Sequence, residues 1–222
     1  MSSDIPVIAI DGPTASGKGT VAQKVAARLG FHYLDSGSLY RLVGLAAARS
    51  STPMHDAPAL AALAQALDVR FEGDRIRLSG EDVSEAIRTE EAGQNASKVA
   101  AIPSVREALM HRQRAFRQAP GLVADGRDMG SVVFPDARPK FFLTASVEAR
   151  AERRHKQLKQ KGISAIIQDV AKELVIRDER DMNRPVAPLR PQPDAYLIDT
   201  TELSADEAVE KILQACQNDL SV

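Results

Sequence analysis

Short apolar runs alternate with amphipathic stretches along most of the 222-residue chain. Residues 5–10 (IPVIAI) are continuously apolar, which is typical of a strand buried on both faces of a sheet. In the segment that follows, Val21, Val25 and Leu29 recur at helical spacing, and Gly30 supplies a helix stop. Four further strands are predicted at residues 31–34, 121–124, 140–144 and 196–198. This alternation predicts an α/β fold, a five-stranded parallel sheet with helices on both faces.

The pattern changes between residues 68 and 90. Val69 and Phe71 alternate with polar residues before Gly73-Asp74, and Ile76 and Leu78 do so after it, which predicts a hairpin with a two-residue turn. We therefore expect a small β-rich insert here. Helices are predicted at residues 39–48, 59–67, 92–101, 104–118, 147–162, 170–184 and 206–216.

Composition excludes several classes of protein. The apolar share is 44% and the charged share 27%, as in ordinary globular proteins, and the net charge of −1 advertises neither nucleic acid nor an anionic membrane as a partner. The single cysteine, Cys216, cannot form an internal disulfide. The N-terminus lacks a signal-peptide pattern, and no apolar stretch is long enough to span a bilayer. We expect a cytoplasmic protein.

A glycine-rich loop follows the first predicted strand and leads into a helix. Its spacing of Gly12, Gly17 and Lys18 is that of a phosphate-binding loop, in which backbone N–H groups and the helix N-terminus face anionic oxygens and the lysine adds a positive charge. The residues predicted to bind ATP are Gly12, Pro13, Thr14, Ala15, Ser16, Gly17, Lys18, Gly19 and Thr20.

Gly19 stands where such loops usually carry the Ser or Thr that holds magnesium. Thr20 is rotated by about 100° around the helix, so it either binds phosphate or only caps the helix. We expect no direct protein ligand for the Mg²⁺ that accompanies ATP, and a metal held through phosphates and water near Asp125. Asp125 closes the strand at 121–124 and could equally cap the turn that follows.

Polar, glycine-bearing clusters follow three of the predicted strands, at residues 11–20, 35–41 and 125–128. Ligands of open α/β sheets bind at the carboxyl ends of the strands, so we expect these clusters to surround one cleft.

Four segments together resemble one family: GPTASGKGT at 12–20, DSGSLYR at 35–41, DGRDMGSVVFPDA at 125–137 and RDERDMNRPVAPL at 177–189. They look like the bacterial cytidylate (CMP) kinases, among the phosphate-loop nucleoside monophosphate kinases, over residues 5 to 215. The resemblance implies transfer of a phosphoryl group from ATP to CMP or dCMP. It also implies a core at 1–50, 119–145 and 186–222, a monophosphate-binding region at 51–118 with the insert at 68–90, and a lid with its following helix at 146–185.

The resemblance also implies the acceptor site. Its CMP-binding residues would be Ser36, Arg41, Ser97, Arg106, Arg127, Asp128, Arg177, Asp181 and Arg184. Reasoning from the residues alone supports part of this site, because a carboxylate such as Asp128 can accept a hydrogen bond from the exocyclic amine that cytosine has and uracil lacks. Arg177, Asp181 and Arg184 fall on one helical face, although ion pairs on a solvated face would show the same spacing.

A phosphate acceptor is already anionic, so the reaction needs cations between two polyanions rather than a general base. The residues predicted to act in catalysis are Lys18, Arg127, Arg177 and Arg154. Arg150, Arg153 and Arg154 share a face of the implied lid, and at least one of them should reach the transferring phosphate; the alternative is a solvated charged face.

Two other functions remain open from sequence. A small kinase with a hydroxyl acceptor, such as shikimate or a sugar acid, would share the loop but not the cytosine-reading residues. A nucleotide-binding switch would not need arginines on the acceptor side. The expected partners are ATP, CMP and dCMP, without nucleic acid or membrane, and the family suggests a monomer.

Overall fold

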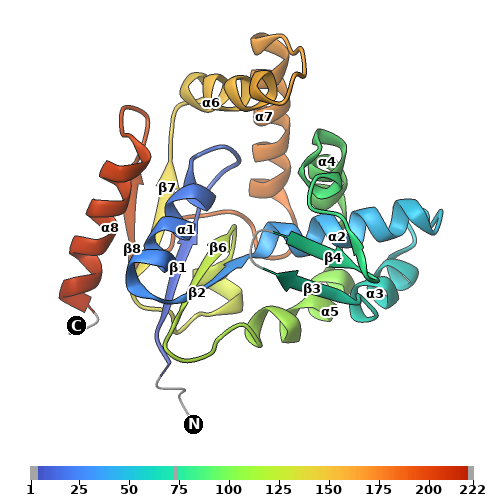
Figure 1. Cartoon of the computed structure of the whole chain (residues 1–222), viewed down its shortest axis with the longest axis horizontal. Coiled ribbons are helices and arrows are strands. Elements are labelled where there is room, and N and C mark those ends of the chain that lie inside the picture. The colour runs from blue at the N-terminus through green and yellow to red at the C-terminus, as the bar shows by residue number, and fades with distance from the viewer. Residues whose placement is uncertain (1–4, 73–74, 220–222) are drawn as a thin grey trace. The chain divides into compact units, whose positions relative to one another are not determined.

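The computed structural model describes residues 5–72 and 75–219, so the predicted Gly73-Asp74 turn lies outside the described residues. The chain divides into two compact units, one of Met1–Leu34 with Phe116–Val222 and one of Asp35–Ala115. Figure 1 labels helices α1–α8 and most of the strands. Each unit is described separately below.

The first unit is built on the predicted five-stranded sheet. Its strands are β1 (Val7–Asp11), β2 (His32–Asp35), β6 (Leu122–Gly126), β7 (Lys140–Thr144) and β8 (Ala195–Asp199), in the spatial order β2-β6-β1-β7-β8. β1 pairs in parallel with β6 and β7, and β7 with β8. Every residue of β1 and β6 is buried, as their continuous apolar pattern predicted. The parallel sheet is confirmed.

Helices α1 (Lys18–Leu29) and α8 (Ala205–Asp219) pack beside this sheet (Figure 1). One core cluster joins Ile8 and Ile10 of β1, Val25 of α1, Phe141 of β7 and Ile212 of α8. α1 ends as predicted at Gly30, whose left-handed φ of 67° suits a residue without a Cβ. The predicted helix and its stop are thus confirmed.

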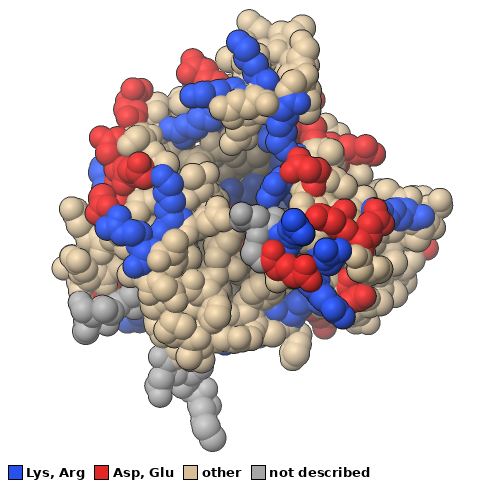
Figure 2. Space-filling view, in the orientation of Figure 1, with Lys and Arg blue, Asp and Glu red and all other residues tan. Residues whose placement is uncertain are grey.

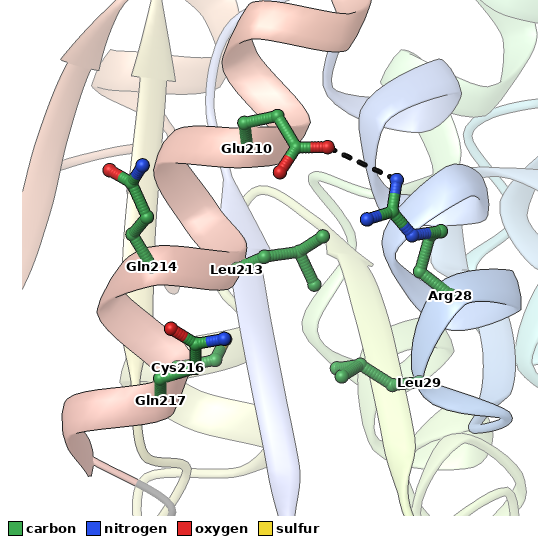
Figure 3. A pocket seen from close by; sticks show the side chains of 7 residues that line it. All are labelled: Arg28, Leu29, Glu210, Leu213, Gln214, Cys216 and Gln217. Atoms are coloured by element: carbon green, nitrogen blue, oxygen red, sulfur yellow. Dashed lines mark hydrogen bonds and ion pairs between the residues drawn. The ribbon is translucent and has the colours of Figure 1, made fainter.

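A surface pocket lies between α1 and α8 (Figure 3). Leu29, Leu213 and Cys216 supply its apolar and sulfur atoms, and Arg28 and Glu210 form an ion pair of 3.1 Å across it. Burial, with a smaller effect of a nearby carboxylate, raises the pKa of the Cys216 thiol to about 12. The thiol therefore stays protonated and unreactive at neutral pH. None of the residues predicted to bind nucleotide lines this pocket.

Helices α6 (Val147–Gln160) and α7 (Ile167–Asn183) pack against each other through Ala151, Leu158, Val170 and Leu174. Figure 2 shows Lys and Arg side chains gathered around them, in the upper part of the view. α7 was predicted to include Arg184, but it ends one residue earlier. Arg184 has an extended backbone (φ −62°, ψ 142°) because the following Pro185 disfavours the helical conformation. The predicted shared helical face is therefore wrong for Arg184.

The second unit contains a small antiparallel sheet of β3 (Val69–Glu72), β4 (Arg75–Leu78) and β5 (Glu81–Asp82). Val69 faces Leu78 and Phe71 faces Ile76 across β3 and β4, which confirms the register that the alternating pattern predicted. β5 has only two residues and was not predicted, since so short a strand leaves no periodic pattern.

The helices of this unit are α2 (Ser36–Arg49), α3 (Ala57–Gln65), α4 (Glu90–Val99) and α5 (Pro103–Arg114), with a 3₁₀ turn η1 (Ala86–Arg88). Asp35, Asp56 and Thr89 cap α2, α3 and α4 with side-chain oxygens. α2 and α4 approach closely at Gly44, where a Cβ would lie 3.0 Å from the Asn95 Cβ. All four predicted helices are present, within three residues at most ends.

Candidate active site

The glycine loop is held in a conformation that few side chains allow. Gly12 has a φ of 156°, and a Cβ there would lie 2.1 Å from the backbone oxygen of Leu143. Gly17, which precedes α1, has a φ of 88°, and Ala15 has a left-handed φ of 59°. The loop therefore depends on glycine where it passes β7 and where it enters α1.

The open end of the loop presents positive groups. The N-cap residue of α1 is Gly17, which makes no side-chain hydrogen bond to the helix, and the N-terminus of a helix favours an anion. Lys18 is buried, and its Nζ donates to the backbone oxygen of Pro13 at 3.1 Å. The Ser16 hydroxyl is fully buried inside the loop. This arrangement fits the phosphates of a nucleotide.

Arg127, the residue after β6, links the loop to α7. Its Nε donates to Asp181 Oδ2 at 2.8 Å, and a terminal nitrogen donates to the Thr14 hydroxyl at 2.7 Å. Burial alone would raise the pKa of Asp181, but Arg127, Arg177 and Arg184 together lower it, so the carboxylate is ionised. Burial would likewise lower the pKa of Arg127, but Asp181 and other carboxylates raise it. The bridge is a charged pair at neutral pH.

Asp128, next to Arg127, is almost completely buried, and its Oδ1 lies 3.2 Å from a guanidinium nitrogen of Arg184. Arg184 also donates from Nε to the backbone oxygen of Ala187. Four residues that were predicted to bind CMP thus form two ion pairs, Arg127 with Asp181 and Arg184 with Asp128, and Arg184 also acts electrostatically on Asp181.

Asp11, at the end of β1, fixes the segment that follows this group. Its two carboxylate oxygens accept from the backbone N–H groups of Met129 (2.8 Å) and Gly130 (2.9 Å), at the start of the π-helix η2 (Met129–Val133). Burial, and to a lesser degree the charges of Asp128 and Asp125, raises the pKa of Asp11 to about 7. Sequence reasoning gave Asp11 no separate role, although an acidic residue at the end of an apolar strand was a visible signal.

Asp125 lies beside the start of α1. Its Oδ2 accepts from the Tyr33 hydroxyl at 2.9 Å and lies 3.1 Å from the position that a Cβ on Gly19 would occupy. Among residues 5–72 and 75–219, no group of three or more His, Cys, Asp or Glu side chains is arranged to hold a metal ion. A single carboxylate next to a phosphate loop still suits Mg²⁺, which keeps water in its shell and takes phosphate oxygens as ligands.

The three predicted lid arginines have different partners. Arg150 is buried, lies 2.5 Å from Asp178 Oδ2 and donates to the backbone oxygen of Thr14 at 3.2 Å. Arg153 donates to the Thr200 hydroxyl at 3.1 Å and to its backbone oxygen. Arg154 donates to Gln157 on its own helix at 3.4 Å. Sequence did not identify Asp178 or Thr200 as partners, because neither lies near these arginines along the chain.

The second unit holds the other four residues that were predicted to bind CMP. Ser36 begins α2 and Ser97 lies in α4, and both are buried. Arg41 donates to the backbone oxygen of Ile87 at 2.9 Å. Arg106 is buried, donates to Ala100 at 3.3 Å and stacks over the Tyr40 ring, 5.8 Å from its centroid. Their contacts with a nucleotide remain predictions.

Comparison with known proteins gives a consistent family. The family model described as cytidylate kinase matches residues 8–218. A cytidylate kinase of Chromobacterium violaceum is 62% identical over 210 residues, covering 95% of this chain and 95% of the relative. One from Bordetella pertussis is 59% identical over 208 residues, covering 94% and 93%.

Among solved structures, a gluconokinase from Sinorhizobium meliloti is 14% identical, with a TM-score of 0.50 and coverage of 96% of this chain and 92% of that one. This likeness concerns the fold alone. Within the described part of the chain, no helix combines the length and apolar character needed to cross a membrane. A match over nearly the whole sequence, at about 60% identity, decides the family: the chain belongs to the cytidylate kinases.

Proposed function

We propose that this protein transfers the γ-phosphoryl group of ATP to CMP or dCMP, giving ADP and CDP or dCDP. The observation that carries the proposal is the Arg127 bridge, which joins Thr14 of the glycine loop to Asp181 (2.7 and 2.8 Å). A cation held between the donor loop and an acceptor residue is what a reaction between two polyanions requires. The names of the relatives support the same acceptor.

On the donor side, Lys18 and the amides at residues 12–20 bind the ATP phosphates. Magnesium accompanies ATP and, when bound, neutralises charge on the phosphate oxygens. Asp125 would contact its water shell, since the carboxylate lies at the first turn of α1. The residues of the chain therefore supply position and charge, and no side chain is needed as a general base.

On the acceptor side, Asp128 accepts a hydrogen bond from the exocyclic amine of cytosine, and Asp181 accepts hydrogen bonds from the ribose hydroxyls. Asp128 is buried beside Arg184, 3.2 Å from its guanidinium, and the resemblance to the family carries its assignment to the cytosine amine. Arg177 and Arg184 add positive charge around Asp181. For the second unit, resemblance to the family carries the proposal that Ser36, Arg41, Ser97 and Arg106 bind CMP.

Residues 146–185 act as the lid, and Arg154 is the lid residue that meets the transferring phosphate. Arg150 pairs with Asp178 and Arg153 with Thr200, and the resemblance to the family carries the choice of Arg154 for this role. Closure would exclude water and so limit hydrolysis of ATP. The monophosphate-binding region at 51–118, a monomeric state, a cytoplasmic location and the absence of nucleic-acid partners complete the proposal.

A coupled assay of ADP release tests the function. With MgATP and a panel of CMP, dCMP, UMP, AMP, GMP and shikimate, CMP and dCMP should react at least tenfold faster than the others. Equal low rates with every acceptor would refute the kinase proposal and favour a nucleotide-binding switch, whereas a preference for shikimate would favour a hydroxyl acceptor.

Selectivity is tested by Asp128→Ala. Since the carboxylate is proposed to read the cytosine amine, kcat/KM for CMP should fall roughly 100-fold and that for UMP by much less. An equal loss for both acceptors would show that Asp128 holds Arg184 rather than the base.

A further inference from the structure

Gly19 follows the loop lysine at the position where related phosphate loops carry Ser or Thr. The structure gives a steric reason for the glycine. A Cβ at residue 19 would lie 3.1 Å from Asp125 Oδ2 and 3.7 Å from the Tyr33 hydroxyl. The first distance is shorter than ordinary van der Waals contact, so a side chain at residue 19 would require the carboxylate to shift by a few tenths of an ångström.

Tyr33 fixes that carboxylate from the other side. Its hydroxyl donates to Asp125 Oδ2 at 2.9 Å, and its ring packs against the core cluster that includes α1 and β6. A tyrosine with a packed ring has few rotamers, so its hydroxyl is a well-placed donor. Hydrogen bonds to an ionised acceptor are also stronger than those between neutral groups.

We propose that Tyr33 is a positioning residue: its hydroxyl holds the Asp125 carboxylate in the space left by Gly19, where that carboxylate contacts the water shell of the metal bound with ATP. The proposal rests on the proposed function for the role of ATP. In this arrangement the loop does without the usual hydroxyl because an aspartate from β6, oriented by a tyrosine from β2, occupies the same side of α1.

Direct binding of a metal tests the proposal apart from activity. The probe is Mn²⁺ in place of Mg²⁺, with the non-hydrolysable ATP analogue AMP-PNP, and bound Mn²⁺ is measured by electron paramagnetic resonance. Tyr33→Phe removes only the hydroxyl and should weaken Mn²⁺ binding roughly tenfold, the low end of what the loss of a partner to a metal-holding carboxylate does. Gly19→Ala should weaken it similarly, although alanine is the better helix former.

Tyr196→Phe is the matched control. Tyr196 also donates to an aspartate, Asp219 at 3.2 Å, but on the exposed face of β8. This variant should bind Mn²⁺ like the wild type. In addition, KM for CMP should stay unchanged in Tyr33→Phe. A general loosening of the fold would instead raise both the dissociation constant for Mn²⁺ and KM for CMP.

A double-mutant cycle shows whether Tyr33 acts through Asp125. In an Asp125→Asn background, Tyr33→Phe should have no further effect on Mn²⁺ binding. Wild-type affinity in Tyr33→Phe, or an equal tenfold loss in both backgrounds, would overturn the proposal. Failure of the wild type to phosphorylate CMP, with the Mn²⁺ differences intact, would instead overturn the proposed function.

Discussion

Asp11→Asn should change how the stability of this protein depends on pH. The carboxyl of Asp11 is almost fully buried between the backbone N–H groups of Met129 and Gly130, and its pKa is raised from the ordinary value of 3.8 to about 7. The folded state therefore binds a proton that the unfolded state releases between these pH values. Compared with the unfolded state, the folded state favours the protonated over the ionised carboxyl by about 4 kcal/mol. This contribution to the unfolding free energy is complete below about pH 4 and is lost as the pH rises through 7.

Over the range from pH 5 to pH 8, the wild type should lose about 3 kcal/mol of unfolding free energy through this one group. An asparagine does not titrate. The unfolding free energy of the wild type minus that of Asp11→Asn should therefore fall by the same amount from pH 5 to pH 8.

Urea unfolding at pH 5, 6, 7 and 8, followed by circular dichroism, measures both curves. Asp194→Asn is a suitable control, because Lys140 lowers the pKa of the exposed Asp194, which therefore stays ionised throughout the range. Parallel curves for the wild type and Asp11→Asn would refute the reasoning, since they would mean that Asp11 is ionised at pH 5 despite its burial.

Two other substitutions test the loop and the lid. Gly12→Ala places a Cβ 2.1 Å from the backbone oxygen of Leu143, so the loop must move and kcat/KM for ATP should fall at least ~100-fold. The control is Gly162→Ala, at a positive φ in open space, which should lose only about 1 kcal/mol of stability and no activity. Arg150→Met leaves Asp178 buried without its cation and should lower the unfolding free energy by about 3 kcal/mol in denaturant titrations, with partial recovery in Arg150→Met/Asp178→Asn. The exposed Arg28→Met should lose under ~1 kcal/mol, and a loss no larger than this in Arg150→Met would contradict the prediction.

Much of the fold could be predicted because its signals are local. The apolar run at residues 5–10 and the strand KFFLT at 140–144 gave β1 and β7 to within two residues. The alternating pattern around 69–78 gave the register of β3 and β4. One local signal was not applied fully: Pro185 directly follows Arg184 and keeps it out of α7.

In the site, too, local motifs could be predicted from the sequence, whereas contacts between distant residues could not. Sequence by itself determined a glycine loop between a strand and a helix, and also the family, because each depends on short motifs whose residues are close together along the chain. Only the tertiary structure decided which charges meet. Asp11 finds its backbone donors 118 residues away, and Tyr33 finds Asp125 after 92 residues. Such contacts leave no periodic trace in one sequence, since they depend on how separate strands align in the sheet, and so the reason for Gly19 became visible only when β2, β6 and α1 were seen together.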